Sequence, residues 1–311
     1  MNTVSWKYDC IIKLILLGRH NGNGADLNRN FPSLFENGKL KNYKKMSKED
    51  ISKLPPSQTN LTNNQKLQPE TKAIMKWVLE NPFVLSLILH GGAVGAFYPF
   101  DDGKYKPAGT ASKSGYVSET ADNNVMKYLA KTYSSNHKDM HLGLPCKHPD
   151  APDFTFENGF QNGAEWYPLS GSMNDFNYLF SNCFEVTVEV TCCKKPDAST
   201  LPSEWDKNFK SLVAYLKQAH IGVKGLVTDT KGNRVADAEI EVIGNEKKIL
   251  ASSRGEYWRL LLPGKYRIQA KGLCNSKHCK VSSVKDVTIK KGEIARLDLR
   301  LKKRNKGPPW I

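Results

Sequence analysis

The chain has 311 residues, of which 39% are hydrophobic and 25% charged, a composition ordinary for a soluble globular protein with room for two domains. Its 46 Lys and Arg exceed its 31 Asp and Glu, giving a net charge of +15. The basic residues are scattered along the sequence, so nucleic acid is not an expected partner. The exception is a basic tail, residues 303–311 with Lys302 before it, for which we expect a solvated end or weak contact with a polyanion or membrane surface.

The seven cysteines favour disulfides over a metal cluster, because no two of them form a Cys-x-x-Cys pair. Asn60-Leu61-Thr62 is a glycosylation sequon in a polar loop. Both features are typical of an extracellular or secretory-pathway protein. We do not expect a signal peptide in residues 1–18, since the apolar run at 11–17 is interrupted by Lys13 and lacks a small-residue cleavage site. We expect a buried strand there.

Residues 1–220 predict helices alternating with apolar strands. A helix is expected at 69–81, with Ile74, Trp77 and Val78 on one face, followed by a strand at 84–89 that is buried on both faces. A second helix is expected at 122–133, with an apolar face made of Val125, Met126, Leu129 and Tyr133.

A long Pro-, Gly- and Asn-rich stretch at 143–174 is expected to build a cleft. After it come a strand at 183–191 and a helix at 203–218, whose apolar stripe consists of Trp205, Phe209, Leu212, Val213 and Leu216. Helices alternating with strands predict an α/β domain with a mixed, mostly parallel sheet covered on both faces.

From Gly222 the pattern changes to short alternating strands separated by turns such as Pro263-Gly264. Strands are expected at 225–229, 238–242, 257–262 and 265–269. We therefore expect a small β-sandwich at residues 221–302.

Three polar side chains are candidates for a catalytic or ligand-binding role. His90 ends a predicted strand and opens a Gly91-Gly92 turn, at the strand end where open α/β sheets place their sites, although a lone histidine is more often structural. Glu189 lies on the strand Phe184-Glu185-Val186-Thr187-Val188-Glu189, where a carboxylate needs a partner or a role, and Glu185 is interpreted as a satisfied structural carboxylate. Arg29, in Asp26-Leu27-Asn28-Arg29-Asn30-Phe31-Pro32, has the planar fork that suits a carboxylate.

These segments in this order, with Trp166-Tyr167 between them, resemble the regulatory zinc metallocarboxypeptidases of the carboxypeptidase N, E, M and D type. The resemblance runs from Arg19 to the end and implies a zinc-carboxypeptidase fold followed by a transthyretin-like sandwich. It implies that peptides or proteins ending in Lys or Arg lose that residue by hydrolysis.

The resemblance also implies a role for each residue of the candidate site. His90 would be a zinc ligand, Glu189 the general base, and Arg19 would stabilise the oxyanion. The substrate-binding residues would be Asn28 and Arg29 on the terminal carboxylate, Tyr167 over the substrate, and Asp101 with Asn174 on the basic side chain. Asn174 stands where the family usually has glutamine, and Ser172 replaces a glycine, so the basic preference is less well defined here.

The resemblance further implies disulfides from Cys192 to Cys146 and from Cys193 to Cys10, with Cys183 a buried thiol; Cys274 and Cys279 could close a local loop. One departure is larger. No His-x-x-Glu occurs in the sequence, and in the family that pair supplies two of the three protein ligands of the zinc. We therefore expect a domain that lacks its front part, binds zinc poorly and is inactive alone. The alternatives are a non-catalytic protein that binds basic C-termini and, for the sandwich, an interaction domain.

Overall fold

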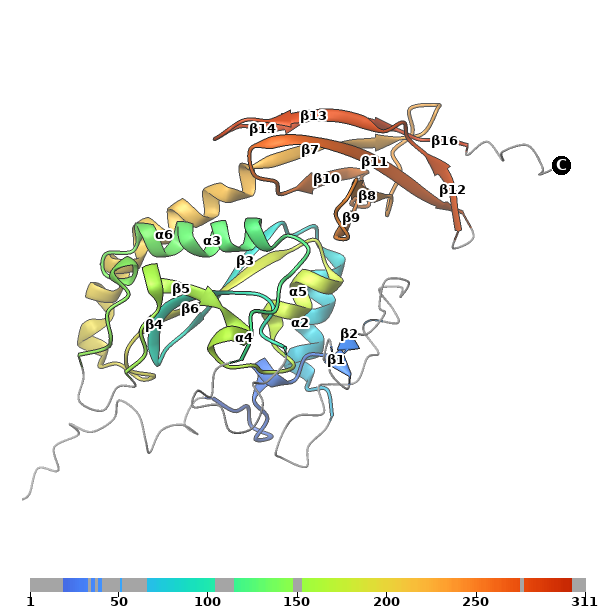
Figure 1. Ribbon diagram of the computed structural model, residues 1–311. Coiled ribbons are helices and arrows are strands. Elements are labelled where there is room, and N and C mark those ends of the chain that lie inside the picture. The colour runs from blue at the N-terminus through green and yellow to red at the C-terminus, as the bar shows by residue number, and fades with distance from the viewer. Residues whose placement is uncertain are drawn as a thin grey trace, which may run out of the picture. The chain divides into compact units, whose positions relative to one another are not determined.

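The computed structural model describes residues 19–32, 35–36, 39–40, 51, 66–103, 115–147, 153–274 and 277–303. The chain forms two compact units, Met1–Leu216 and Lys217–Ile311 (Figure 1). The predicted strand at 11–17, the sequon at Asn60, Cys10 and the tail beyond Lys303 lie outside the described residues.

The first unit is built on a mixed sheet, as predicted. Its strands are β3 (Leu85–His90), β4 (Ala93–Tyr98), β5 (Phe160–Asn162) and β6 (Phe184–Thr191), in the order β3-β6-β4-β5. The pairs β3–β6 and β4–β5 are parallel, whereas β4 and β6 are antiparallel. A separate two-stranded ribbon pairs β1 (Phe35–Glu36) with β2 (Lys39–Leu40).

Helices cover both faces of this sheet (Figure 1). They are α2 (Pro69–Glu80), α3 (Asn123–Asn136), α4 (Gly163–Trp166), α5 (Met173–Phe180) and α6 (Leu201–Leu216). Helix α3 buries the four residues predicted for its apolar face and joins α6 through a hydrogen bond from the Tyr133 hydroxyl to Asn208. On the other face, Asn177 of α5 donates to Glu185 of β6 at 2.7 Å.

Helix α5 lies partly in the stretch predicted to be irregular. Its N-terminus is capped by the Ser172 hydroxyl, which accepts from the backbone N–H of Asp175. It buries three polar residues, Asn174, Asp175 and Asn177. Because these positions carry no apolar residues, the 3.6-residue periodicity that predicts a helix is weak there.

Burial in the first unit differs in three places from what the sequence pattern suggests. Trp77 of α2 is exposed, and Met75 is buried instead. Strand β3 is half-buried, with Leu89 56% exposed, because among the described residues it pairs with β6 alone and forms an edge of the sheet. The apolar stripe of α6 faces outward: Trp205, Phe209, Val213 and Leu216 are exposed, whereas the buried residues are Asn208, Ser211 and Tyr215.

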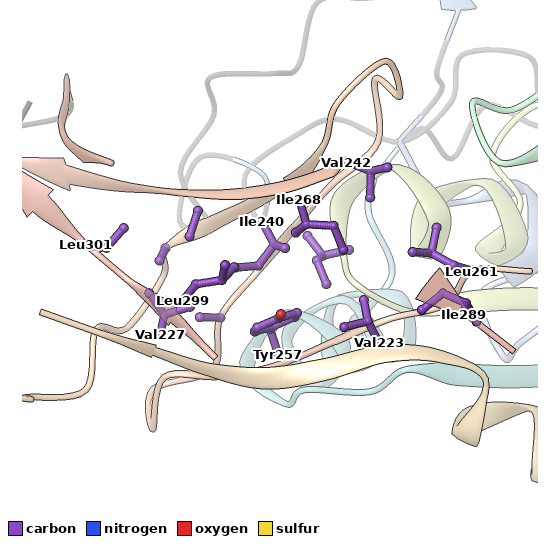
Figure 2. Packing of buried hydrophobic residues seen from close by; sticks show 14 residues of the cluster. Val223, Val227, Ile240, Val242, Tyr257, Leu261, Ile268, Ile289, Leu299 and Leu301 are labelled. Carbon is purple, nitrogen blue, oxygen red and sulfur yellow. The ribbon is translucent and has the colours of Figure 1, made fainter. Parts of the chain in front are cut away.

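The second unit is the predicted β-sandwich. One sheet holds β10 (Glu256–Arg259), β7 (Gly222–Thr228), β14 (Ile294–Arg296) and β15 (Leu299–Arg300). The other holds β16 (Lys302–Lys303), β12 (Lys277–Val281), β11 (Gly264–Cys274), β8 (Glu239–Val242), β9 (Lys248–Leu250) and β13 (Lys285–Ile289). Four of these strands, β7, β8, β10 and β11, correspond to the predicted ones with shifted ends. Figure 2 shows the core between the sheets, where Val223, Val227 and Tyr257 meet Ile240 and Ile268.

The pairing of Cys146 with Cys192 and the free thiol of Cys183 confirm the predictions for these residues. Cys146 and Cys192 form a disulfide that spans 46 residues of sequence. Cys193 is also disulfide-bonded, and Cys10, its predicted partner, lies outside the described residues. Cys183 is buried as a thiol and donates to the Ser86 hydroxyl at 3.1 Å. In the described part of the chain, no helix has the length and apolar character needed to cross a membrane.

Candidate functional site

The register between β3 and β6 brings His90 and Glu189 together. The two strands run parallel, and His90 is the direct partner of Glu189 at their carboxyl ends. Side chains of paired residues lie on the same face of a sheet. His90 Nδ1 is 3.7 Å from Glu189 Oε1, which is a close approach but too long for a hydrogen bond.

A short 3₁₀ helix, Leu27–Arg29, brings the predicted carboxylate clamp to the same place. Asp26 caps it by accepting from the Asn28 backbone N–H. Asn28 Nδ2 lies 3.4 Å from His90 Nε2, and Asn28 Oδ1 accepts from the Met173 backbone at 2.9 Å. The Arg29 guanidinium donates to the Asn28 carbonyl at 2.8 Å. The clamp is therefore held by α5 on one side and lies against His90 on the other.

Arg19, the predicted oxyanion residue, forms an ion pair with Asp26 at 2.7 Å. Its guanidinium acts electrostatically on His90, Glu189 and the Tyr167 hydroxyl. The pKa of Tyr167 is raised, first by burial of its hydroxyl, and Arg29, Glu189, Asp101 and Arg19 all influence it. Four charged residues of the candidate site are thus close enough to influence the Tyr167 hydroxyl.

Burial shifts the two central groups in opposite directions. It lowers the pKa of His90 to about 4, helped by the positive charges of Arg29 and Arg19. It raises the pKa of Glu189 to about 7, although Lys194, Arg19 and Arg29 act against that rise. At neutral pH the imidazole is neutral, and the carboxyl has the pKa expected of a general base.

Asp101 and Asn174 form a buried pair close to Arg29 and Tyr167. Asn174 Nδ2 donates to Asp101 Oδ1 at 3.3 Å, and the Ser172 hydroxyl also bonds the Asp101 carboxylate. Burial raises the pKa of Asp101 to about 6, while Ser172 and Arg29 lower it. Gly163 makes room for this carboxylate, because a Cβ there would lie 1.9 Å from Asp101 Oδ1.

The structure adds a residue that the sequence reasoning missed. The Asp175 carboxylate accepts the backbone N–H groups of Asp101 and Asp102 at 2.7 and 2.8 Å, and so fixes the backbone that carries Asp101. Its signal in the sequence is an acidic residue in the first turn after Ser172, which also reads as ordinary helix capping. The structure brings together all eight predicted residues, Arg19, Asn28, Arg29, His90, Asp101, Tyr167, Asn174 and Glu189.

Zinc does not fit the described residues alone. Neutral His90 is a suitable ligand, and Asn28 and Glu189 flank it. A catalytic zinc site uses three protein ligands and an open position. Within the described ranges no three His, Cys, Asp or Glu side chains converge on one point. These residues supply one ligand of such a site.

Comparison with known proteins identifies the families that the two parts of the chain match. The zinc carboxypeptidase family matches residues 9–211, and the carboxypeptidase regulatory-like domain matches residues 222–302. Carboxypeptidase D of Drosophila melanogaster is 46% identical over 82% of this chain and 16% of its own length. Carboxypeptidase D of Homo sapiens is 42% identical over 81% of this chain and 16% of its own. Carboxypeptidase M of Mus musculus is 42% identical over 81% of this chain and 50% of its own.

The chain therefore spans about a sixth to a half of the length of these curated relatives. The family match covers most of the chain and contains every residue of the candidate site. The chain belongs to the zinc carboxypeptidase family, with a carboxypeptidase regulatory-like domain after its α/β domain.

Proposed function

We propose that the site binds the C-terminal residue of peptides and proteins that end in Lys or Arg. Arg29 and Asn28 would hold the terminal carboxylate, since the planar guanidinium can donate two parallel hydrogen bonds to it. The observation that carries this proposal is that Asn28, next to Arg29, approaches His90, the strand partner of Glu189, while Arg29 is close enough to act electrostatically on Asp101. A cation-binding group and an anion-binding group then lie within reach of one amino acid.

Asp101 and Asn174 support the preference for a basic side chain. Both are buried, and Asn174 Oδ1 has no hydrogen-bond partner among the described residues. Buried acceptors of this kind favour a ligand that brings several N–H donors and a positive charge. Ser172 and the shortened amide of Asn174 would shape this subsite, with Asp101 as its charged group.

Family chemistry is hydrolysis of the last peptide bond, for which a bound zinc ion would supply Lewis acidity. On this chain, Glu189 would serve as the general base, and Arg19 would stabilise negative charge on the carbonyl oxygen of the substrate. His90 is the described residue able to hold the metal.

A non-catalytic role is the second candidate. It is favoured by the absence of His-x-x-Glu from the sequence, since the clamp and Asp101 can bind a basic C-terminus without cleaving it. We expect this polypeptide to bind but not to turn over its ligand. The experiment is incubation of the 311-residue chain and excess zinc with a dansylated peptide ending in Ala-Arg. Turnover that disappears in Glu189→Gln would show that the chain is an active enzyme and contradict this expectation.

We also propose passage through an oxidising compartment, which the Cys146–Cys192 disulfide supports. The regulatory-like domain would support the folding of the α/β domain. A polyanion or membrane surface remains a proposed weak partner of the basic C-terminal residues, of which Lys302 and Lys303 are exposed.

A further inference from the structure

One face of β6 carries three polar residues at alternating positions, Glu185, Thr187 and Glu189, which we call the β6 polar face. All three side chains are buried. Helix α5 lies over this face, because Asn177 donates to Glu185 Oε2 at 2.7 Å, and Asn174 lies one turn earlier on the same side of the helix. The β6 polar face thus leads from Glu189, the proposed general base, to the fully buried Glu185.

Five buried oxygen atoms on these two elements have no hydrogen-bond partner among the described residues. They are Glu189 Oε2, Thr187 Oγ1, Asn174 Oδ1, Asn177 Oδ1 and Glu185 Oε1. Orphaned buried polar atoms are uncommon in folded proteins, and several in one place indicate a ligand or water between them. Four of the five are acceptors that carry no proton when the glutamates are ionised. A ligand that supplies hydrogen-bond donors could therefore satisfy all five oxygen atoms.

Glu185 is the most deeply buried residue of the β6 polar face. Both of its hydrogen bonds, from the Ser86 hydroxyl at 2.6 Å and from Asn177, go to Oε2. Oε1 is left unpaired, so the interpretation of Glu185 as a fully satisfied structural carboxylate is incomplete. Glu185 and Thr187 are two positions apart along the strand, or about 7 Å. Asp101, the charged group of the proposed side-chain subsite, is close enough to act electrostatically on Glu185.

We propose that Glu185 is a second acidic determinant of the side-chain subsite, one layer beneath Asp101, and that its unpaired oxygen selects for a donor-rich cation. A guanidinium has five N–H donors and a delocalised charge, which matches several acceptors and two carboxylates better than a neutral group does. This inference rests on the location of the subsite in the proposed function, and it does not depend on hydrolysis or on zinc.

Agmatine is a suitable probe, because it carries the arginine side chain without a carboxylate. Its affinity is measured by titration calorimetry at pH 8 for the full chain, for Glu185→Gln and for the control Glu204→Gln. Glu204 is a carboxylate of the same domain that pairs with Lys207, so its variant loses the same charge. We expect agmatine to bind the wild type and the control with equal affinity. We expect it to bind Glu185→Gln about tenfold more weakly, because this variant loses one charge-assisted hydrogen bond.

Equal agmatine affinity in Glu185→Gln and the wild type would overturn the inference, as would a wild type that does not bind agmatine. If Glu185→Gln does not fold, the test becomes the pH dependence of agmatine binding. It is measured in the Glu189→Gln variant, in which residue 189 cannot titrate. The groups facing Glu185 are Ser86 on β3, Asn177 on α5, Tyr215 on α6 and Asp101 after β4. Because the pKa values of Asp101 and Glu185 are raised to about 6 and about 7, affinity should still rise above about pH 6.5, and a plateau there would overturn the inference.

The outcome also separates this inference from the proposed function. Agmatine binding that depends on Glu185, in a chain that does not bind peptides ending in Arg, would sustain the inference and reject the function. Binding of peptides ending in Arg, together with unchanged agmatine affinity in Glu185→Gln, would sustain the proposed function and reject the inference.

Discussion

His90 and Glu189 show how one physical cause prepares two residues for different tasks. Burial disfavours the charged form of each group, so it lowers the pKa of the histidine to about 4 and raises that of the carboxyl to about 7. The histidine is then a neutral electron-pair donor, while the carboxyl exchanges its proton near neutral pH. The surrounding arginines reinforce the first shift and moderate the second.

The sequence could predict residues that occur in family motifs, such as Arg29, His90 and Glu189. It could not predict Asp175 or the unpaired oxygen of Glu185, because their roles depend on contacts between α5, β6 and the segment after β4. No spacing along the chain records which of two carboxylate oxygens receives the hydrogen bonds.

His137 makes stability depend on pH. Its Nδ1 accepts the backbone N–H groups of Asp139 and Met140 at 3.1 and 3.0 Å, so the folded state needs the neutral ring. Burial lowers its pKa below the ordinary 6.5. Because the unfolded chain binds the proton more readily, this contribution to stability is complete above about pH 6.5 and is lost as the pH falls below it.

We expect His137→Asn, which keeps an acceptor but does not titrate, to lose less stability than the wild type between pH 7.5 and 5.5. Urea unfolding at the two pH values measures the difference. Identical pH dependence in the two proteins would show that His137 does not contribute to it.

Helix α6 shows where sequence periodicity succeeds and where it fails. The helix itself was predictable from its apolar stripe, but the stripe faces solvent, with Leu216 66% exposed. Periodicity reports that one face is apolar, not that a partner covers it. Its polar side is buried instead because Asn208 bonds Tyr133 of α3 and the Tyr215 hydroxyl donates to the Ser86 carbonyl.

This orientation predicts different effects for two residues of α6. Phe209→Gln should change the free energy of unfolding by less than about 0.5 kcal/mol, because Phe209 is exposed, and should reduce binding of an apolar dye. Tyr215→Gln should cost about 3 kcal/mol, because a buried ring and its hydrogen bond are lost. Denaturant unfolding with dye fluorescence measures both. A large cost for Phe209→Gln would mean that this face is covered in solution.

At the scale of the whole molecule, the two fold classes follow from the change in sequence pattern near Gly222. Helices and apolar strands before it gave a mixed α/β sheet, and short alternating strands after it gave a sandwich with its own core. Several short strands, such as β9 and β14, were missed because two or three residues carry too little alternation to be recognised. The domain boundary at residue 220 stays a prediction.

The net charge divides unevenly between the units. Lys217–Ile311 contains 22 Lys and Arg and 9 Asp and Glu, a net charge of +13, which leaves +2 for Met1–Leu216. The excess positive charge is therefore concentrated in the second unit and is not evenly scattered along the chain. A fragment of residues 217–303 should unfold cooperatively and elute from a cation exchanger at higher salt than a neutral sandwich of its size. A fragment without a cooperative transition would show that the sandwich needs the α/β domain.

The central claim is that this chain holds a free C-terminal carboxylate and a basic side chain at one site. Titration calorimetry with a peptide ending in Ala-Arg, as the free acid and as the amide, tests it most directly. The account predicts binding of the free acid, at least about tenfold weaker binding of the amide, and a similar loss for the free acid in Arg29→Met. Equal binding of the two peptides, or full affinity in Arg29→Met, would contradict it.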